Sequence, residues 1–227
     1  MDDMIIVGAS GGIGRFLAEE FKGEYVLWRT RYRSSTDSEY DRVNVMNPQS
    51  VREYATVLGQ CLSDRVILVN AAGISINGIG HKMPQSSFAE VLHTNLVGAF
   101  NLASAFLPIM RDRRWGRIIN LSSVVGSAGI PGTVAYSTSK AGLMGLTRTL
   151  AVENAKKGIT VNVLRLGYMA VGMIDTIQPD KRQIIRRNIP AGYFGNPGNI
   201  VAAIRFLVDA PYVTGTAIDI DGGFLCS

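Results

Sequence analysis

The feature that most constrains the fold is a glycine-rich turn between a strand-like and a helix-like stretch near the N-terminus. The short apolar run 4–7 leads into the glycine-rich turn 8–14, and a helical pattern follows over 15–21. This succession is the local context of a dinucleotide-binding turn, in which backbone N–H groups approach a pyrophosphate at the helix N-terminus. A generic glycine turn is the alternative, and the flanking strand and helix make it the weaker interpretation.

Further along the chain, apolar runs continue to alternate with helical patterns, which predicts an α/β domain. The expected strands cover residues 24–31, about 42–45, 65–69, 117–123, 160–166 and 217–220. The expected helices cover residues 48–62, 86–110, about 136–157 and 199–207. Residues 34–41 are polar and few, so we expect a truncated or irregular crossover there. With no linker or internal repeat, residues 1–227 are interpreted as one domain.

Three residues around the strand 117–123 and the helix after it suggest acid–base chemistry. Tyr136 and Lys140 are four residues apart, so on a helix they share one face. A neighbouring ammonium group favours the phenolate, so we expect the pKa of Tyr136 to be lowered. Ser123 ends the preceding strand and can donate a hydrogen bond to the same substrate oxygen. The alternative is a chance pair on an amphipathic helix, with a half-buried tyrosine and a solvated lysine.

The end of the second expected strand indicates which nucleotide is bound. Many NAD-binding domains carry an acidic residue there, whereas this chain has Arg29, Thr30 and Arg31. We interpret these residues as a pocket for the extra phosphate of NADP, with Arg15 converging on it; a solvated basic loop is the alternative. Asn44 ends the third expected strand, near where an adenine ring would lie.

Small and polar residues elsewhere extend this expected site. Asn70, Ala71, Ala72 and Gly73 follow the fourth expected strand, and their small size leaves space for a ligand. Asn95 interrupts an apolar helix face and must find hydrogen-bond partners. A ligand-side role and a hydrogen bond that bends the helix are both open for Asn95.

Composition excludes several classes of protein. Hydrophobic residues make up 47% and charged residues 18%, and we identify no run long enough to span a membrane and no secretory pattern. The two cysteines lack metal-like spacing, and we assign no metal to the isolated His81 and His93. We therefore expect a cytoplasmic protein that binds no metal, membrane or nucleic acid. A net charge of +5 indicates acidic ligands such as phosphates, or an acidic protein partner.

These motifs together resemble the short-chain dehydrogenase/reductase family over nearly the whole chain. The matching residues are the turn from Gly8 to Gly14, Asn70 to Gly73, Asn95, Ser123, Tyr136 and Lys140, and Ser123 precedes Tyr136 by the thirteen residues that the family uses. The resemblance implies a doubly wound Rossmann-type α/β fold with about seven parallel strands. It also implies that Tyr136 is the general acid, that Ser123 orients the carbonyl, that Lys140 holds the nicotinamide ribose, and that Asn95 supports a water relay.

The cofactor that we expect is NADPH. The positions assigned to its binding are Gly8, Ser10, Gly11, Gly12, Ile13, Gly14, Arg15, Thr30, Arg31, Asn44, Val45, Asn70, Ala71, Ala72, Gly73, Tyr136, Lys140, Gly167 and Met169. Three positions depart from the family pattern, which usually has threonine at Val7, proline at Leu166 and threonine at Val171.

Within the family, the chain is similar to 3-oxoacyl-[acyl carrier protein] reductases in stretches such as 116–120, 139–143, 158–162 and 189–192. This likeness implies NADPH-dependent reduction of a 3-oxoacyl thioester, in fatty-acid or polyketide-type biosynthesis. A reductase or dehydrogenase of a free ketone, sugar or cyclic alcohol is the second interpretation, and a non-catalytic NADP-binding regulator is the third.

The same likeness implies partners. We expect an acyl carrier protein to deliver the substrate to a basic surface at the active-site mouth, formed by the arginines of 111–117 with Lys156 and Lys157. A dimer or tetramer is expected, paired through the helices that carry Asn95 and Tyr136. Residues 168–196 are expected to cover the substrate.

Overall fold

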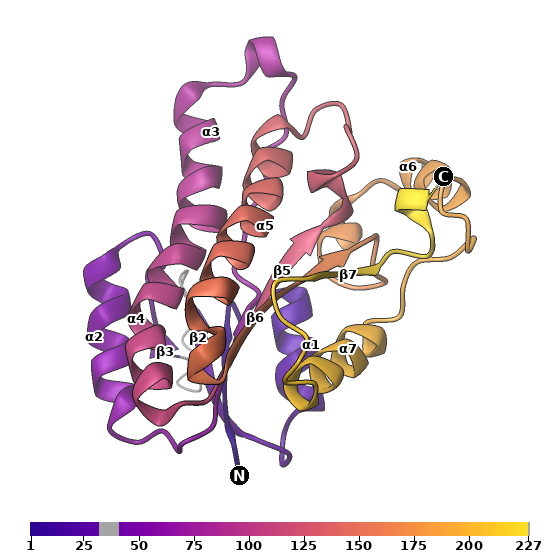
Figure 1. Ribbon diagram of the computed structural model, residues 1–227. Helices are drawn as coiled ribbons and strands as arrows, with labels where there is room; N and C mark the ends of the chain where they lie inside the picture. Colours follow the sequence, from indigo (N-terminus) through magenta and orange to yellow (C-terminus); the bar gives the residue numbers. More distant parts are fainter. Residues whose placement is uncertain (32–40, 227) are drawn as a thin grey trace.

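The computed structural model describes residues 1–31 and 41–226, in which strands alternate with helices (Figure 1). The strands are β1 Asp3–Val7, β2 Val26–Arg31, β3 Asp41–Arg42, β4 Val66–Asn70, β5 Gly116–Ser123, β6 Ile159–Leu166 and β7 Ala217–Ile220. The α-helices are α1 Gly12–Glu20, α2 Pro48–Gly59, α3 Gln85–Leu92, α4 Gly98–Arg113, α5 Val134–Asn154, α6 Pro179–Arg187 and α7 Gly198–Asp209. Short 3-10 turns lie at Gly80–Lys82, Val124–Gly126, Ala155–Lys157, Met173–Thr176 and Phe224–Cys226, and we call the turn Val124–Gly126 η3.

The strands form one parallel sheet in the order β3-β2-β1-β4-β5-β6-β7. The order reverses direction at β1, whose neighbours are β2 on one side and β4 on the other. At such a switch point the connections on either side leave in opposite directions, so a crevice opens at the carboxyl ends of the strands. The prediction of a doubly wound parallel sheet of about seven strands is confirmed.

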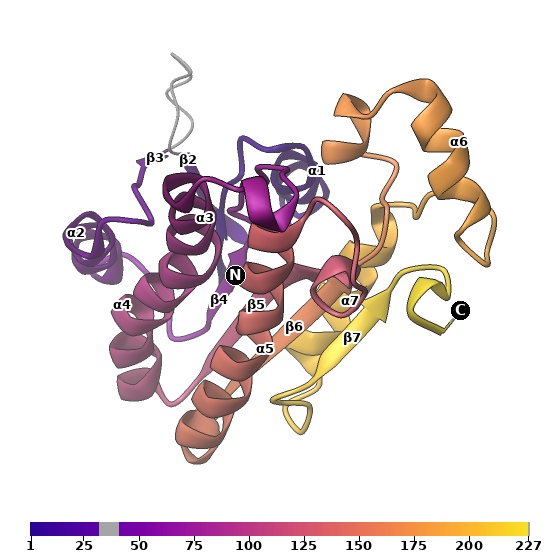
Figure 2. The same ribbon diagram turned by 90° about the horizontal axis from the view of Figure 1, so that it is seen from above.

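Helices cover both faces of the sheet, as the views in Figures 1 and 2 agree. One apolar cluster joins alternate strand residues to α2, α4 and α5, and a second joins the intervening strand residues to α1 and α7. This alternation explains why β1 and β4 are apolar at every position: a strand buried on both faces has no solvent side. In the described part of the chain, no helix combines the length and the apolar character needed to cross a bilayer.

Two predicted elements differ from those observed. The third strand covers only Asp41–Arg42, rather than about 42–45, because Val43 and Val45 turn inward and pack in the cluster beneath α2 and α4. The helix predicted over 86–110 is divided by a π-helical segment, His93–Val97, and continues to Arg113. The crossover predicted over 34–41 lies largely outside the described residues.

Candidate functional site

A cavity of about 800 Å³ opens at the carboxyl edge of the sheet, beside the switch point. Ile13 lines it on the side of the glycine-rich turn, Leu121 and Ser123 line it from β5, and Leu166 lines it from β6. On its outer side, the segment after β6 contributes residues from Gly167 to Ile185, so this segment covers the cavity as the sequence predicts. The cavity is therefore continuous from the glycine-rich turn to the Tyr136 helix.

Ser123, Tyr136 and Lys140 meet at the inner wall of this cavity. Val134 to Asn154 form the uninterrupted helix α5, so Tyr136 and Lys140 lie one turn apart, and the Lys140 Nζ is 5.5 Å from the centre of the Tyr136 ring. The Ser123 hydroxyl hydrogen-bonds the Tyr136 phenol from the end of β5. The Lys140 Nζ donates to the Leu121 carbonyl at 2.7 Å, which fixes the ammonium between α5 and the sheet.

The expected lowering of the Tyr136 pKa is wrong for this cavity. Tyr136 is only 8% exposed, and its burial raises the phenol pKa to about 12, with the Ser123 hydrogen bond acting in the opposite direction. Burial lowers the pKa of Lys140 to about 8. Both shifts favour the neutral form, because a buried charge loses its hydration. Loss of hydration therefore outweighs the attraction between the two groups that the sequence suggested.

Asn95 lies in the π-helical segment, where the extra residue in the turn directs its side chain at the loop after β4. Its Nδ2 donates to the Ile74 carbonyl at 2.9 Å and to the Ser139 hydroxyl at 3.0 Å, and its Oδ1 accepts from the Ile74 N–H at 2.8 Å. Asn95 thus finds the hydrogen-bond partners that the sequence required, within a local change of helix type, and its ligand-side role stays a prediction. Ser139 was missed as its partner, although it lies three residues after Tyr136 on α5.

Gly73 separates Asn95 from Lys140. A Cβ at this position would lie 3.3 Å from the Asn95 Oδ1 and 3.5 Å from the Lys140 Nζ. Such a Cβ would crowd the Asn95 Oδ1, whereas its distance from the Lys140 Nζ is an ordinary contact. The loop after β4 therefore brings the four candidate catalytic residues, Asn95, Ser123, Tyr136 and Lys140, into one arrangement; their roles stay predictions.

The glycine-rich turn fits a dinucleotide. Gly8 has a φ of +81°, and a Cβ there would lie 2.8 Å from the backbone of Ala72, so the turn packs directly on the loop after β4. Helix α1 begins after Gly11 with no side-chain cap in the described structure and no acidic residue in its first turn. Its positive end is thus available to an anion. Ile13, Ala71 and Gly73 line the cavity from this side, which places the turn and the Tyr136 helix at one continuous space.

The residues expected at the adenosine end are placed as follows. Thr30 is buried, and its carbonyl accepts from the Ala9 N–H at 2.9 Å, which ties β2 to the turn. Arg31 ends β2 on the face that α1 covers, because Leu27, four residues earlier, packs in the α1 cluster. The guanidinium of Arg15, on α1, donates to the Ser10 carbonyl at 3.3 Å. Arg15 on α1 and Arg31 on the sheet face that α1 covers therefore lie on the same face of the sheet.

Other predicted cofactor residues have mainly structural contacts. Asn44 and Val45 follow β3; the Asn44 Oδ1 accepts from the Met46 N–H, and the Val45 carbonyl accepts from the Asn101 side chain at 2.8 Å. The Asn70 Oδ1 accepts from the Ala72 N–H at 3.3 Å. In the covering segment, Gly167 and Met169 line the cavity. Ser10 lies in the turn itself, and Gly12 and Gly14 lie in the first turn of α1.

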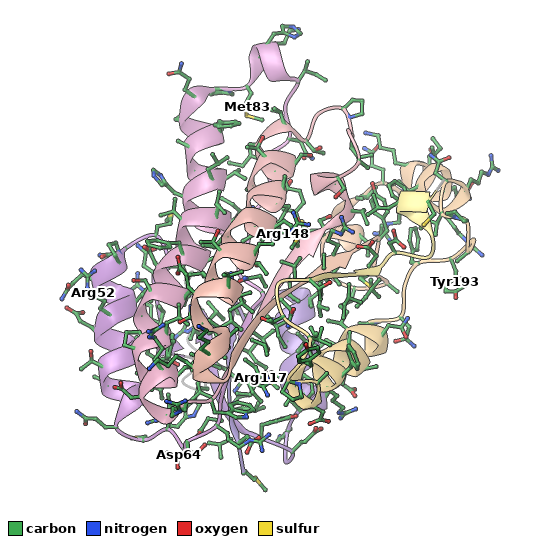
Figure 3. The ribbon with its side chains drawn as sticks, in the orientation of Figure 1. Arg52, Asp64, Met83, Arg117, Arg148 and Tyr193 are labelled. Atoms are coloured by element: carbon green, nitrogen blue, oxygen red, sulfur yellow. The ribbon has the colours of Figure 1, made fainter. Side chains whose placement is uncertain are left out.

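The basic surface predicted from residues 111–117 is not at the mouth of this cavity. These residues lie at the end of α4 and the start of β5, at the amino edge of the sheet. Arg117 is 4% exposed, donates to the Val208 carbonyl at 2.9 Å and stacks on Trp115. Figure 3 shows Arg117 at the opposite end of the molecule from Met83, which packs in the cluster around Tyr136. The arginines of 111–117 thus lie together at one edge of the sheet, but it is the amino edge and not the carboxyl edge where the cavity opens.

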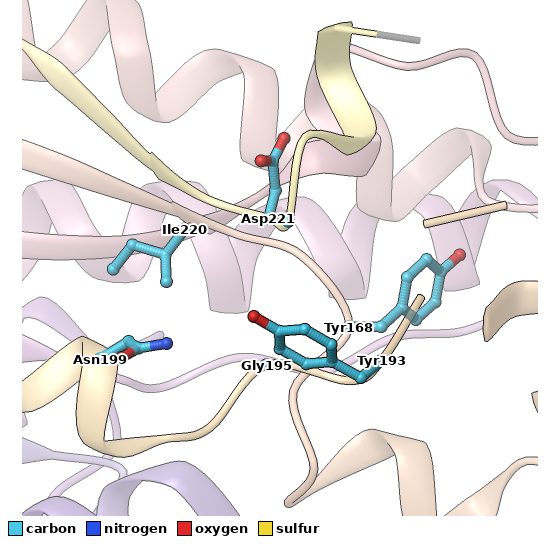
Figure 4. Close-up of a pocket in the computed structure, with 7 residues that line it drawn as sticks. Tyr168, Tyr193, Gly195, Asn199, Ile220 and Asp221 are labelled. Carbon is cyan, nitrogen blue, oxygen red and sulfur yellow. The ribbon is translucent and has the colours of Figure 1, made fainter. Parts of the chain in front are cut away.

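A separate hollow of about 60 Å³ lies behind the ends of β6 and β7 (Figure 4). It is lined by Tyr168, Tyr193, Gly195, Asn199, Ile220, Asp221 and Gly222. Its volume suits about two water molecules, so it cannot hold a nucleotide.

A doubly wound sheet, an uncapped glycine-rich turn and a buried tyrosine–lysine pair in a shared cavity define a nucleotide-dependent oxidoreductase. The chain belongs to the short-chain dehydrogenase/reductase family: residues 29–225 match the family described as Enoyl-(Acyl carrier protein) reductase. It is an NADP-dependent oxidoreductase, with NADPH as its cofactor.

Relatives and solved structures agree with this class. The chain is 36% identical to a 3-oxoacyl-[acyl-carrier-protein] reductase FabG of Haemophilus influenzae, over 98% of both chains. It is 33% identical to the FabG of Escherichia coli, over 96% of this chain and 95% of the relative. The structure described as ElxO with NADP bound matches with a TM-score of 0.90 at 27% identity, over 100% and 99% of the two chains. An aldohexose dehydrogenase of Thermoplasma acidophilum also has a TM-score of 0.90, at 26% identity, over 100% and 94%.

Proposed function

We propose that this protein reduces the ketone of a 3-oxoacyl thioester to the 3-hydroxyacyl thioester. The observation that carries the proposal is the apolar lining of the cavity beyond Ser123 and Tyr136. One wall is Ile74, Ile76, Val124 and Val125, and the covering wall is Met173, Ile174, Ile177 and Ile185. Such walls suit an acyl chain, whereas the hydroxyls of a sugar would lose hydrogen bonds to water there.

The reaction follows from the positions of the chain's own groups. NADPH, when bound, supplies the hydride that reaches the ketone carbon. Tyr136 transfers its phenol proton to the ketone oxygen, while the Ser123 hydroxyl holds that oxygen in place. The Lys140 ammonium then faces a phenolate instead of a neutral phenol, which stabilises the charge that has formed. Asn95 fixes the backbone of Ile74 beside these groups, and solvent returns the proton to Tyr136.

The test of this function compares substrates in one assay of NADPH consumption. The panel contains a 3-oxoacyl group on an acyl carrier protein, the same group on coenzyme A, a free cyclic ketone and an aldose with NADP⁺. We expect the highest kcat/KM for the carrier-bound substrate. A higher value for the free ketone or aldose would assign the second interpretation, and NADPH binding without any turnover would favour a regulator.

A basic surface on α6 is our proposed docking site for the carrier protein. Lys181, Arg186 and Arg187 are exposed on α6, and Ile184 is exposed between them, while Ile185 lines the cavity. Acyl carrier proteins are named in the relatives' activities, and an acidic partner would be steered to such cations. This surface takes the place of residues 111–117, which lie at the other edge of the sheet.

Charge reversal tests this docking site. Arg186→Glu/Arg187→Glu should lower kcat/KM for carrier-bound substrate about tenfold at low salt and leave that for a small ketone unchanged. Arg52→Glu, on the exposed side of α2, is the control for charge reversal at a remote surface position. Added salt should narrow the difference between the α6 variant and the wild type. An equal loss for the small ketone would mean that the variant harms the cavity rather than docking.

We propose that the protein is a dimer or tetramer paired through α4 and α5. Phe100 is 52% exposed on α4 and Val152 is 82% exposed on α5, so each helix carries an exposed apolar side chain that pairing would bury. Light scattering of the wild type and of Phe100→Glu measures the mass; a monomeric wild type contradicts the proposal. The cytoplasmic location and the single-domain organisation stay predictions.

A further inference from the structure

Arg165 connects two elements at the carboxyl edge of the sheet, next to the Ser123 wall of the cavity. Its Nε and Nη2 donate to both oxygens of Asp219, at 2.5 and 2.7 Å. Its Nη1 donates to the Ser127 hydroxyl at 3.0 Å. One guanidinium thus joins β7 to the residue that follows the turn η3.

The register of the sheet makes this position close to the site. Arg165 pairs with Ser122 of β5 and with Asp219 of β7, and the next residue, Leu166, pairs with Ser123. The side chain of Arg165 therefore reaches Ser127 from the strand beside the one that presents Ser123. Arg165 is not among the described residues that line the cavity, so any effect of Arg165 on the reaction must pass through other residues.

The turn η3, together with Ser123 beside it, can transmit such an effect to the cavity. Val124 and Val125 wall the cavity, the Ser123 hydroxyl accepts from the Val125 N–H at 3.4 Å, and the Ser127 N–H donates to the Val124 carbonyl at 2.9 Å. On one side the turn rests on α5, where a Cβ on Gly126 would lie 2.8 Å from a backbone nitrogen. On its other side the Arg165 guanidinium holds Ser127.

We propose that Arg165 is a positioning residue, which through Ser127 holds η3 so that the Ser123 hydroxyl faces the Tyr136 phenol. This inference rests on the proposed reductase. A bidentate pair with Asp219 fixes the plane of the guanidinium, and the remaining N–H groups then have one direction. Lysine has no such planar fork and could not reproduce both contacts. The pair is part-exposed, so its contribution is orientation rather than stability.

The experiment compares Arg165→Gln and Ser127→Ala with Arg205→Gln. Arg205 is the matched control, because its Nε and Nη2 also donate to both oxygens of a carboxylate, Glu24, at a remote exposed position. Hydrogen exchange is measured for the amides of 124–128, and kcat is measured against pH in both directions with the panel substrate that the wild type turns over fastest. NADPH affinity should be unchanged in all variants.

We expect exchange at 124–128 to become about tenfold faster in Arg165→Gln and Ser127→Ala, because opening of the turn costs less. The kcat for ketone reduction should fall about tenfold, since the Ser123 hydroxyl is no longer aligned. Alcohol oxidation requires the phenolate, and the Ser123 hydrogen bond lowers the phenol pKa. Weakening that bond should therefore lower the small phenolate fraction, and with it the rate of alcohol oxidation, at every pH assayed. The double variant Arg165→Gln/Ser127→Ala should lose little more kcat than either single variant, because both changes remove the same contact.

The inference is overturned if Ser127→Ala exchanges and oxidises alcohol like the wild type, or if Arg205→Gln shows the same changes as Arg165→Gln. Failure of the proposed function appears differently, as a wild type that reduces no thioester. In that case the rates of reduction and oxidation are measured with the free ketone and its alcohol. Exchange that stays slow in Arg165→Gln would overturn the positioning role whatever the substrate.

Discussion

Tyr136→Phe separates proton donation from every other role of this side chain. The ring packs in the cluster with Val124, Val125 and Ala135, and phenylalanine keeps that packing. The lost hydroxyl has the Ser123 hydroxyl as its partner, and Ser123 is part-exposed at the cavity. Removing a hydrogen bond whose partner can reach water changes the free energy of unfolding by about 1 kcal/mol or less.

The effect on turnover should be much larger. A general acid contributes about 10²–10⁴-fold, and the Ser123 hydroxyl, which hydrogen-bonds the phenol, is too weak an acid to replace it. We therefore expect kcat to fall by that factor while NADPH binding, followed by its fluorescence, stays at the wild-type level. Tyr25→Phe is the control, because it removes a phenol hydroxyl beside α7, on the other side of the sheet. A Tyr136→Phe enzyme with more than about a tenth of wild-type kcat would refute the acid role.

Three further variants test other parts of the site. Arg31→Ala should lower the ratio of kcat/KM for NADPH over NADH at least about tenfold, since a guanidinium that binds the extra phosphate is lost; an unchanged ratio would remove the phosphate pocket. Gly73→Ala should lower kcat about tenfold, because its Cβ would lie 3.3 Å from the Asn95 Oδ1. Lys140→Met should remove a pH dependence of stability. The folded Lys140 has a pKa of about 8 against an ordinary 10.5, so the unfolded chain binds more protons between these values. Wild-type stability should therefore rise with pH across that window, by at most about 3 kcal/mol relative to the variant in denaturant titrations, and parallel curves would contradict the burial of Lys140.

The sequence predicts the parts of this fold that local chemistry determines. The strand, glycine-rich turn and helix over 4–21 follow from residue spacing, and the strand 217–220 was predicted at the observed bounds. The third strand was predicted too long, since Val43 and Val45 have strand-like side chains whose positions are decided by packing against α2 and α4. The π-helical segment contains Asn95, which hydrogen-bonds the backbone of Ile74, twenty-one residues away. A contact between residues so far apart in the sequence cannot be predicted from local residue spacing.

Charge and pKa were the least predictable properties. The sequence of residues 111–117 predicts a basic surface. Arg117, however, is the second residue of a buried strand, and its guanidinium donates to backbone carbonyls. The motif of Tyr136 and Lys140 predicts their proximity correctly. It cannot predict how deeply both are buried, and burial determines the direction of the phenol pKa. In both cases the missing information is the solvent exposure of a side chain, which the whole fold determines.

The two pKa values assign the pH dependence of the reaction to Lys140 rather than to Tyr136. With a pKa of about 12, the phenol keeps its proton throughout the range in which the enzyme can be assayed. Lys140, with a pKa of about 8, is charged at neutral pH and loses its charge just above it. Proton donation leaves a phenolate, which a charged lysine stabilises and a neutral lysine does not. The rate of ketone reduction should therefore fall above about pH 8 although the acid itself is still protonated, and a rate that stayed constant to the highest pH assayed would mean that Lys140 does not take part.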